Sequence, residues 1–355
     1  MVAPLNIVAV RSLIPKRRFG TEQVEQAFMH WLADRPEDER IKARRILRNS
    51  GVDTRASCLS MEEIFTPATL TESSGRYRRN AVELGVRLLR ETLESAAIRP
   101  QDVDILITTS CTGFMIPSVD AYMANELGMR SDLVRLPVTQ MGCAAGASAL
   151  MYAAEMLRGR PGGVAAIVNI ELPTNTIQLG DFSMANIVST ALFSDGLGCT
   201  ILRNGGEPGV ARIDGWGTHQ VTDSLELLGY QLTTGGFLMH LDPTLPEVIA
   251  THFLAAVSSL LTRTNLTIED IAHFAIHPGG VRILDRIESI LARSNRDARL
   301  SRETMRNHGN MSSSTVIVIL ERLLASRPAP GKALLMSFGP GFGTHQLLLT
   351  LGRDD

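Results

Sequence analysis

The sequence repeats one strand-and-helix plan, and this repeat constrains the fold more than any single motif does. Residues 102–107 and residues 270–276 are similar runs that start with acidic residues and continue as buried strands, and a helical pattern follows each. A further apolar run comes later in each half, at 164–170 and at 333–336. Strands that alternate with helices are typical of an α/β layered fold. We therefore interpret the chain as an internal duplication of one α/β unit.

The spacing of four polar residues follows the same repeat. Ser110 stands after the first of the matching strands, and Cys143 follows it by 33 positions. His277 stands after the second matching strand, and Asn310 also follows by 33 positions. We expect residues at matching strand ends and helix starts to converge on a pseudo-twofold axis between the two halves.

The repeat also sets the expected boundaries. We place the two halves at residues 1–205, which carry the cysteine, and 206–355, which carry the histidine and the asparagine. In the first half we expect a helix over 21–50 and an amphipathic helix over 76–97, with a strand over 133–138.

Composition excludes several classes of protein. The 355 residues are 44% hydrophobic with a net charge of -2, and no block of like charge predicts nucleic-acid binding. No apolar run reaches the roughly 18–20 residues of a membrane span, and the N-terminal sequence lacks a signal-peptide layout. The four cysteines have no CxxC spacing, so we expect neither a metal site nor a disulfide framework, and we predict a cytoplasmic enzyme. They are Cys58, Cys111, Cys143 and Cys199.

Cys143 is the candidate nucleophile. It lies in a Gly- and Ala-rich turn between an expected strand and an expected helix. A helix N-terminus stabilises a thiolate through its dipole and its free N–H groups. A buried cysteine is also often a small, inert hydrophobic residue, and this alternative stays open on the residues alone.

His277 and Asn310 are the candidate partners of the thiol. His277 follows an apolar strand, where sites form in α/β folds, and an imidazole can accept the proton of a thiol. A single histidine is also compatible with a purely structural role. The amide of Asn310 can donate to a developing oxyanion, although Asn is also a good helix N-cap. The matching spacing to Cys143 favours the functional interpretation.

Five motifs occur in an order that resembles the chalcone synthase, or type III polyketide synthase, superfamily. The resemblance runs from about residue 100 to the end of the chain, and the loop at 110–115 resembles bacterial members. The motifs are Gly-Cys-Ala-Ala-Gly at 142–146, Ala-Leu-Phe-Ser-Asp-Gly at 191–196, His-Pro-Gly-Gly at 277–280, Gly-Asn-Met-Ser-Ser at 309–313 and Phe-Gly-Pro-Gly at 338–341.

The resemblance implies a homodimer with the thiolase fold, five layers in the order αβαβα. It implies that acyl-CoA and malonyl-CoA are the substrates, and that neither a cofactor nor a metal is needed. Cys143 would hold the starter acyl group as a thioester. His277 and Asn310 would hold the malonyl thioester carbonyl, assist decarboxylation and stabilise the enolate and the tetrahedral intermediate. The product would be a pyrone, a resorcinol or another polyhydroxyarene.

The same resemblance assigns the walls of a substrate cavity. Phe193 matches an aromatic gatekeeper, and Gly339, Pro340 and Gly341 match a loop that shapes the cavity. Five positions depart from the family pattern. Met239 replaces a second gatekeeper Phe, Tyr230 replaces a Gly and Cys111 replaces a Thr of the plant enzymes. Ser194 and Ser337 replace family glycines. Tyr230 should narrow the cavity, whereas a flexible Met should open another wall.

Basic residues are expected near the mouth of a CoA tunnel. Arg48 and Arg55 lie where family members place such residues. The alternative interpretation of both is a solvated surface arginine.

Three rival functions remain. A β-ketoacyl synthase III also uses Cys, His and Asn, but it would show His-Gln-Ala-Asn and Asn-Thr-Ser elements that this chain lacks at 277–280 and 310–312. A papain-like protease is compatible with the 134 residues between Cys143 and His277, but it leaves the duplication unexplained. A thiolase-like partner without catalytic activity would not need all three side chains.

Overall fold

Nine strands of the computed structural model, which describes residues 3–352, form one hydrogen-bonded sheet in the order β11-β12-β13-β8-β1-β7-β6-β4-β5. The strands of the N-terminal half are β1 (Leu5–Leu13), β4 (Ile105–Thr109), β5 (Val134–Val138), β6 (Val164–Glu171) and β7 (Gly196–Asn204). Those of the C-terminal half are β8 (Ala211–Gln220), β11 (Ile271–Ile276), β12 (Gly331–Gly339) and β13 (Gly343–Leu351).

The strand order repeats the same pattern in both halves. β4 and β6 are parallel, as are β11 and β12. In the N-terminal half β7 then pairs antiparallel with β6 and with β1. In the C-terminal half β13 pairs antiparallel with β12 and with β8 in the same way. The two sets meet where residues 5–7 of β1 pair with residues 211–213 of β8. The duplication predicted from the sequence is therefore present in the topology. The predicted boundary at residues 205 and 206 falls in the connection between β7 and β8.

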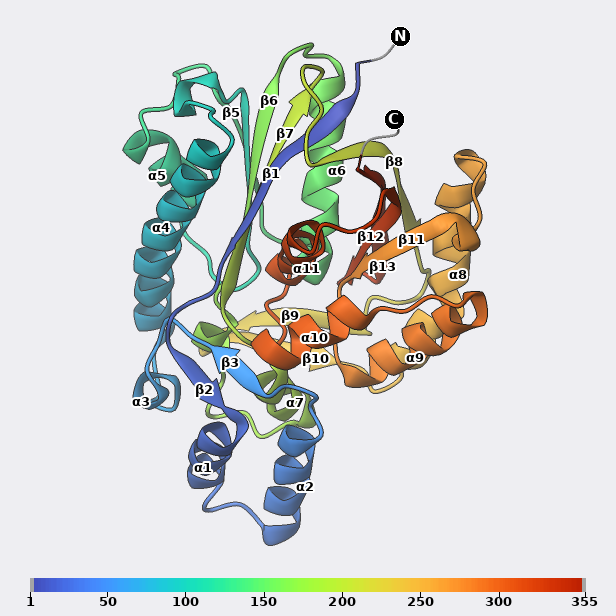
Figure 1. Ribbon diagram of the computed structural model, residues 1–355. Coiled ribbons are helices and arrows are strands. Elements are labelled where there is room, and N and C mark those ends of the chain that lie inside the picture. The colour runs from blue at the N-terminus through green and yellow to red at the C-terminus, as the bar shows by residue number, and fades with distance from the viewer. Residues whose placement is uncertain (1–2, 353–355) are drawn as a thin grey trace.

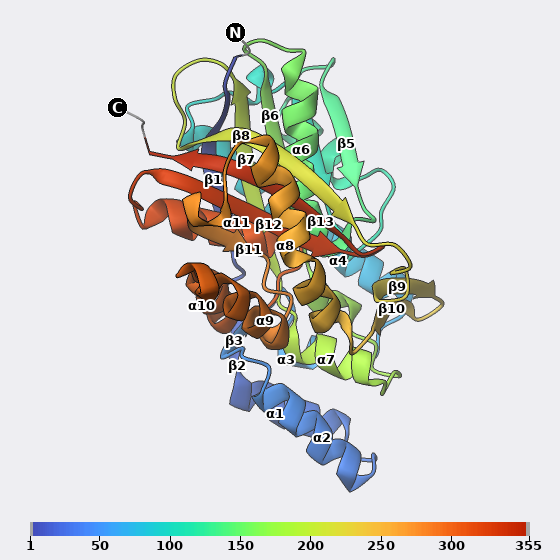
Figure 2. The same cartoon turned by 90° about the vertical axis from the view of Figure 1, so that its right-hand side faces the viewer.

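The helices complete five layers (Figure 1). α4 (Leu70–Ser95) and α5 (Val119–Glu126) cover the outer face of the N-terminal strands. α6 (Ala145–Arg158) and α11 (Ser314–Ala325) lie between the two sets of strands. α8 (Leu245–Arg263) and α9 (Val281–Leu291) cover the outer face of the C-terminal strands (Figure 2). The αβαβα thiolase fold expected from the sequence is confirmed.

Small residues allow the two central helices to approach each other closely. A Cβ atom added to Gly146 of α6 would lie 2.4 Å from the backbone oxygen of Ser313, which is closer than real Cβ atoms come. Ten of the 14 residues of α6 are buried, and alanine is the most frequent among them. The starts of the two helices, which follow Cys143 and Asn310, are consequently held side by side.

α8 is long and apolar enough to cross a membrane by length and composition alone, and no other helix within residues 3–352 meets that test. From the sequence we expected no apolar run as long as a membrane span. One side of α8 packs into the core with residues such as Phe253 and Leu260, which is the arrangement of a core helix.

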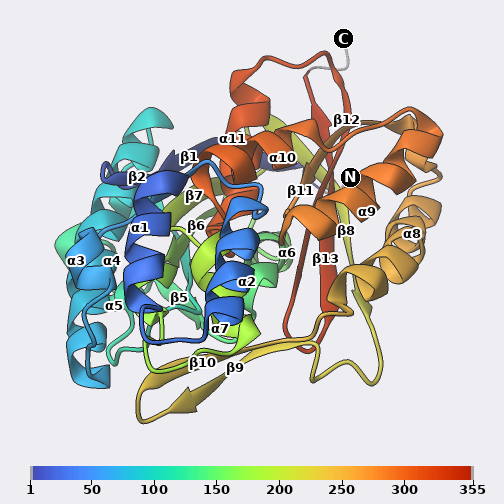
Figure 3. The same ribbon diagram turned by 90° about the horizontal axis from the view of Figure 1, so that it is seen from below.

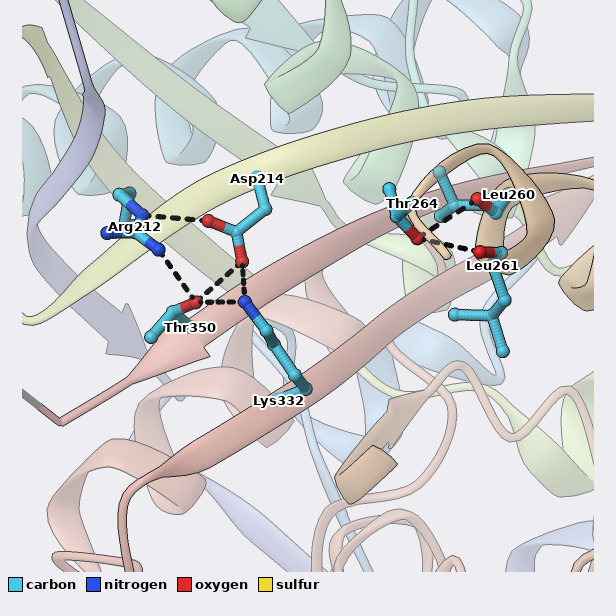
Figure 4. Close-up of polar contacts among 7 residues, drawn as sticks. All are labelled: Arg212, Asp214, Leu260, Leu261, Thr264, Lys332 and Thr350. Atoms are coloured by element: carbon cyan, nitrogen blue, oxygen red, sulfur yellow. Dashed lines mark hydrogen bonds and ion pairs between the residues drawn. The ribbon is translucent and has the colours of Figure 1, made fainter. Parts of the chain in front are cut away.

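A polar cluster ties the C-terminal strands together beside the end of α8 (Figure 4). The carboxylate of Asp214 accepts hydrogen bonds from Lys332 at 2.8 Å and Thr350 at 2.6 Å, and Arg212 donates to it at 2.8 Å. Because these residues come from β8, β12 and β13, the cluster joins three neighbouring strands at one of their ends.

The predicted helix over 21–50 is wrong, because two helices occupy this segment. α1 (Thr21–Trp31) and α2 (Glu37–Arg48) lie side by side (Figure 3) and form a hairpin that projects beyond the layers (Figure 2). Pro36 precedes α2, and a proline disfavours a helical conformation in the residue before it. Phe28 and Trp31 pack edge to face near the C-terminal end of α1.

The remaining elements surround one end of the central helices. They are β2 (Arg18–Gly20), β3 (Thr54–Ala56), α3 (Met61–Ile64), α7 (Met184–Leu192), β9 (Leu228–Thr233), β10 (Gly236–Leu241) and α10 (Arg299–His308). β9 and β10 form a separate hairpin. In the C-terminal half, α10 takes the place in the chain that β5 has in the N-terminal half.

Candidate active site

Cys143 lies in the tight turn that begins α6. The preceding Gly142 has a φ of 50°, and a Cβ atom there would lie 2.6 Å from Pro340, so the turn needs glycine. The half-buried thiol of Cys143 contacts the hydroxyl of Ser312 at 3.4 Å. Burial raises the pKa of Cys143 to about 12, although the hydrogen bond with Ser312 opposes this shift.

Asn310 is fixed by bonds on both sides of its amide. Its Nδ2 donates to the backbone oxygen of Gly279 at 2.9 Å, and its Oδ1 accepts from the backbone N–H of Ser312 at 2.8 Å. The side chain is only 3% exposed. The N-cap of α11 is Ser313, so the alternative interpretation of Asn310 as that N-cap is not what the structure has. One N–H of the amide is left for a substrate.

His277 follows β11 directly and is 1% exposed. Neither ring nitrogen has a hydrogen-bond partner, and Phe338 packs edge to face against the ring at a centroid distance of 5.6 Å. Burial lowers the pKa of His277 to about 3, so the imidazole is neutral near pH 7. Buried polar groups without a partner cost about 1–3 kcal/mol each, and such exceptions concentrate at functional sites.

Two bridging residues connect the three candidates. Ser312 contacts Cys143 through its hydroxyl and Asn310 through its backbone N–H. Gly279 accepts from Asn310 and lies two positions after His277. The strand ends and helix starts of the two halves therefore converge, as the repeated spacing predicts.

The charge states differ from the thiolate and imidazolium pair that the sequence suggested. Burial raises the pKa of the Cys143 thiol and lowers that of the His277 imidazole, so each is neutral in the free protein. A single buried charge is disfavoured in these surroundings.

A second thiol and a buried carboxyl stand beside Cys143. The sulfur of Cys111 contacts the same hydroxyl of Ser312, at 3.3 Å. Glu171 accepts from the backbone N–H of Cys111 at 3.2 Å, from Thr112 at 3.1 Å and from the hydroxyl of Ser313. Burial raises the pKa of Glu171 to about 7, against these hydrogen bonds, which lower it.

Sequence reasoning missed Glu171. The available signal was its position, because a glutamate directly follows the apolar run 164–170 at the end of a fully buried strand. A carboxyl group at the end of a buried strand is costly unless it is hydrogen-bonded, and that cost favours a function.

The predicted cavity residues gather around these groups. Tyr230 and Met239 are directly opposite in the β9–β10 hairpin, so their side chains share one face. Burial raises the pKa of the Tyr230 phenol, and the thiols of Cys111 and Cys143 raise it further. Phe193 forms a β-bridge with Asn310.

The glycine-rich turn between β12 and β13 lies against Cys143. A Cβ atom at Gly339 would lie 2.6 Å from the backbone oxygen of Met141, and Pro340 contacts Gly142. Gly341 has a φ of 70° and faces open space. The role of this turn as a cavity wall stays a prediction, and its close approach depends on the absence of a side chain at Gly339.

The structure separates the two arginines that were predicted to bind CoA. Arg55 is 4% exposed, and its guanidinium donates to the backbone oxygen of Ala191 at 2.7 and 2.9 Å and to Ser50 at 3.1 Å. It therefore fastens the end of α7 inside the protein and is not a solvated surface arginine, while its predicted contact with CoA stays a prediction. Arg48 lies on the exposed side of α2, paired with Glu25, and remains a prediction.

Within residues 3–352, no group of three His, Cys, Asp or Glu side chains is arranged to hold a metal ion.

Comparisons with known proteins agree along the whole chain. The family "FAE1/Type III polyketide synthase-like protein" matches residues 15–209, and "Chalcone and stilbene synthases, C-terminal domain" matches residues 218–351. A 1,3,6,8-tetrahydroxynaphthalene synthase of Streptomyces peucetius subsp. caesius is 31% identical, over 97% of this chain and 92% of that protein. Phloroglucinol synthase of Pseudomonas fluorescens is 29% identical, over 93% and 94%. The crystal structure of the tetrahydroxynaphthalene synthase of Streptomyces coelicolor A3(2) superposes with a TM-score of 0.92 at 26% identity, over 98% and 99% of the two chains.

Proposed function

The chain belongs to the type III polyketide synthase family, and we propose that Cys143, His277 and Asn310 perform its condensation reaction. The observation that carries this proposal is the convergence of a thiol, an imidazole without a partner and an oriented amide at one end of the central helices. The families and relatives that match are of the type III kind, which gives the β-ketoacyl synthase III alternative no support.

Loading comes first. The sulfur of Cys143 attacks the thioester carbonyl of an acyl-CoA, the bond from that carbonyl to the CoA sulfur breaks, and CoA leaves as its thiol. The neutral imidazole of His277 has a free lone pair that accepts the thiol proton and returns it to the departing CoA. The acyl group stays on Cys143 as a thioester.

Extension follows on the same residues. Malonyl-CoA loses CO2, and the electron pair of the broken bond moves into the thioester carbonyl to form an enolate. The N–H of His277 and the free N–H of Asn310 donate to that oxygen, and preorganised donors of this kind stabilise developing charge. The enolate carbon then attacks the Cys143 thioester, which frees the sulfur and leaves the longer chain on CoA.

We also propose that the product is a small polyhydroxyarene, a pyrone or a resorcinol. Two relatives are synthases of tetrahydroxynaphthalene and phloroglucinol, both polyhydroxyarenes. Tyr230 supports a compact cavity, because its ring takes up space that a glycine would leave open and is packed edge to face against Phe237.

The decisive experiment offers the purified protein malonyl-CoA and a series of acyl-CoA starters, without acyl carrier protein, and identifies products by mass. We expect polyketide products from free CoA esters. Product formation only with malonyl groups delivered on a carrier protein would contradict the proposal.

In the same assay Tyr230→Gly should lengthen or redistribute the products, and an unchanged profile would show that Tyr230 does not limit the cavity.

The protein is further proposed to be a cytoplasmic homodimer. All four cysteines are free thiols, which suits a reducing compartment. Phe114 and Ile116 are 58% and 84% exposed, and large exposed apolar side chains of this kind suit a protein contact. Light scattering of the purified protein should give twice the mass of one chain, and Ile116→Asp should lower it.

A further inference from the structure

Asp195 is a buried carboxylate that the reaction above does not use. It is fully buried and follows the gatekeeper position Phe193 by two residues. Its Oδ2 accepts from the backbone N–H of Cys58 at 2.8 Å and from the hydroxyl of Thr174 at 2.7 Å. Its Oδ1 accepts from the backbone N–H of Thr174 at 2.9 Å. No Lys, Arg or His pairs with it among the residues that the structure describes.

Residues 192–195, which we call the strap, run between β3 and Asn310. On one side, the backbone N–H of Asn310 donates to Leu192 and the backbone N–H of Ser194 donates to Asn310, each at 2.9 Å. On the other side, the N–H of Asp195 donates to the backbone oxygen of Ala56 at 2.9 Å, and the N–H of Ala56 donates to the hydroxyl of Ser194 at 2.7 Å.

The carboxylate determines whether the strap can stay in this place. The donors to the Asp195 carboxylate come from two different segments, one near Cys58 after the end of β3 and one in the turn at Thr174. Because both oxygens of the carboxylate accept, Asp195 joins these two segments. Burial raises the pKa of Asp195 to about 6, against these hydrogen bonds. Burying a charge without a neighbouring cation costs free energy of folding. Proteins keep such groups where a functional site needs the geometry that the group maintains.

We propose that Asp195 is a positioning residue for the condensation reaction: it fixes the strap, and the strap holds the backbone of Asn310 and the ring of Phe193 at the site. The inference rests on the proposed function of Asn310. Asp195 touches no reacting atom, so its effect reaches the reaction only through the strap.

The variant Asp195→Asn tests this directly. An amide offers one acceptor oxygen, so its NH2 group must face a donor, either that of Cys58 or that of Thr174. We expect malonyl-CoA decarboxylation and condensation to fall about 10- to 100-fold, because small displacements of positioned groups have effects of that size. Acyl transfer to Cys143, read as the mass increase of the protein with starter acyl-CoA alone, should stay within about 3-fold, since it does not depend on Asn310.

Two further variants keep the test decisive if Asp195→Asn folds poorly. Thr174→Val keeps the shape and the backbone N–H but removes one donor, and it should give a smaller loss of the same kind. Asp214→Asn is the matched control, because Asp214 is also a mostly buried, hydrogen-bonded carboxylate but lies in the strand cluster of Figure 4. It should lower the melting temperature and leave the ratio of decarboxylation to acyl transfer unchanged.

A double variant separates this inference from the proposed function. Adding Asp195→Asn to Asn310→Ala should cause no further loss of malonyl-CoA decarboxylation, because Asp195 affects that step through the amide of Asn310. Additive losses, or equal losses of acyl transfer and decarboxylation in Asp195→Asn and Thr174→Val, would overturn the positioning role. If Asn310→Ala alone left decarboxylation intact, the proposed role of Asn310 would fail instead.

Discussion

The two halves of the molecule place different chemistry at equivalent positions. The residue after β4 is Ser110 and the residue after β11 is His277, while the turns before α6 and α11 carry Cys143 and Asn310. The N-terminal half thus supplies sulfur, and the C-terminal half supplies neutral nitrogen donors. One scaffold used twice places these residues at equivalent strand ends and helix starts, and in the proposed reaction their divergence separates the nucleophile from the hydrogen-bond donors.

The connections between equivalent strands differ as well. Between β6 and β7 the chain has 24 residues, which include α7 and end at the strap, whereas between β12 and β13 it has three. The short turn brings Gly339 against Cys143, and the long connection reaches Asn310. Each half therefore supports the reactive residue of the other half.

Removing the nucleophile should have the largest effect. Cys143→Ala should lower product formation about 10⁴-fold or more, as loss of a covalent nucleophile does in other enzymes. Mass spectrometry should show no acyl group on the variant after incubation with starter acyl-CoA. The control Cys199→Ala removes a buried thiol on β7 and should keep most of the activity. Acylation of the Cys143→Ala protein at another residue would contradict the assignment of the nucleophile to Cys143 of the N-terminal half.

The equivalent strand ends allow a direct test of the comparison. His277→Ala should reduce malonyl-CoA decarboxylation about 10²- to 10³-fold, because it removes a preorganised donor. Ser110→Ala, at the matching position, should stay within a few fold. Asn310→Ala should resemble His277→Ala, and CO2 release measures all three. Equal losses at His277 and Ser110 would show that the two halves have not divided the task.

The duplicated fold could be predicted from the sequence because both halves keep a spacing of 33 residues between the strand end and the helix start, although the elements between them differ. β5 lies within that spacing in one half and α10 in the other. The three site residues were also predictable, since strand ends and helix starts carry them. Arg55 and Glu171 were not, because burial decides their roles: Arg55 is enclosed by the end of α7, and Glu171 depends on donors from loops distant in sequence. The single helix expected over 21–50 failed at Pro36.

The carboxyls of the N-terminal half predict a pH dependence of stability. Burial raises the pKa of Glu171 from 4.5 to about 7, so the folded protein holds a proton that the unfolded chain has released. The stability contributed by this proton is fully present below about pH 4.5 and is lost as the pH rises through about 7. Integrated over that range, the loss is up to about 3 kcal/mol.

Glu171→Gln should remove this part of the dependence. Urea unfolding of both proteins at pH 5.5 and pH 8 measures it as the difference of two differences. Asp195 titrates in the same direction, with a pKa raised to about 6, but it is present in both proteins and cancels. The same change in unfolding free energy between the two pH values in wild type and variant would show that Glu171 is ionised throughout this range.

Arg48 should give the smallest effect, and it tests whether the N-terminal half also binds substrate by charge. Its guanidinium is 64% exposed and pairs with Glu25, and an exposed charge contact is worth about 0–1 kcal/mol. Arg48→Ala should therefore raise the KM for malonyl-CoA no more than about 5-fold, with kcat unchanged, and added salt should reduce the difference. Arg282, on α9 of the C-terminal half and similarly exposed at 65%, provides the matched control. If Arg282→Ala raises KM and Arg48→Ala does not, CoA is held by the C-terminal half, and the N-terminal half contributes to the reaction only from its interior.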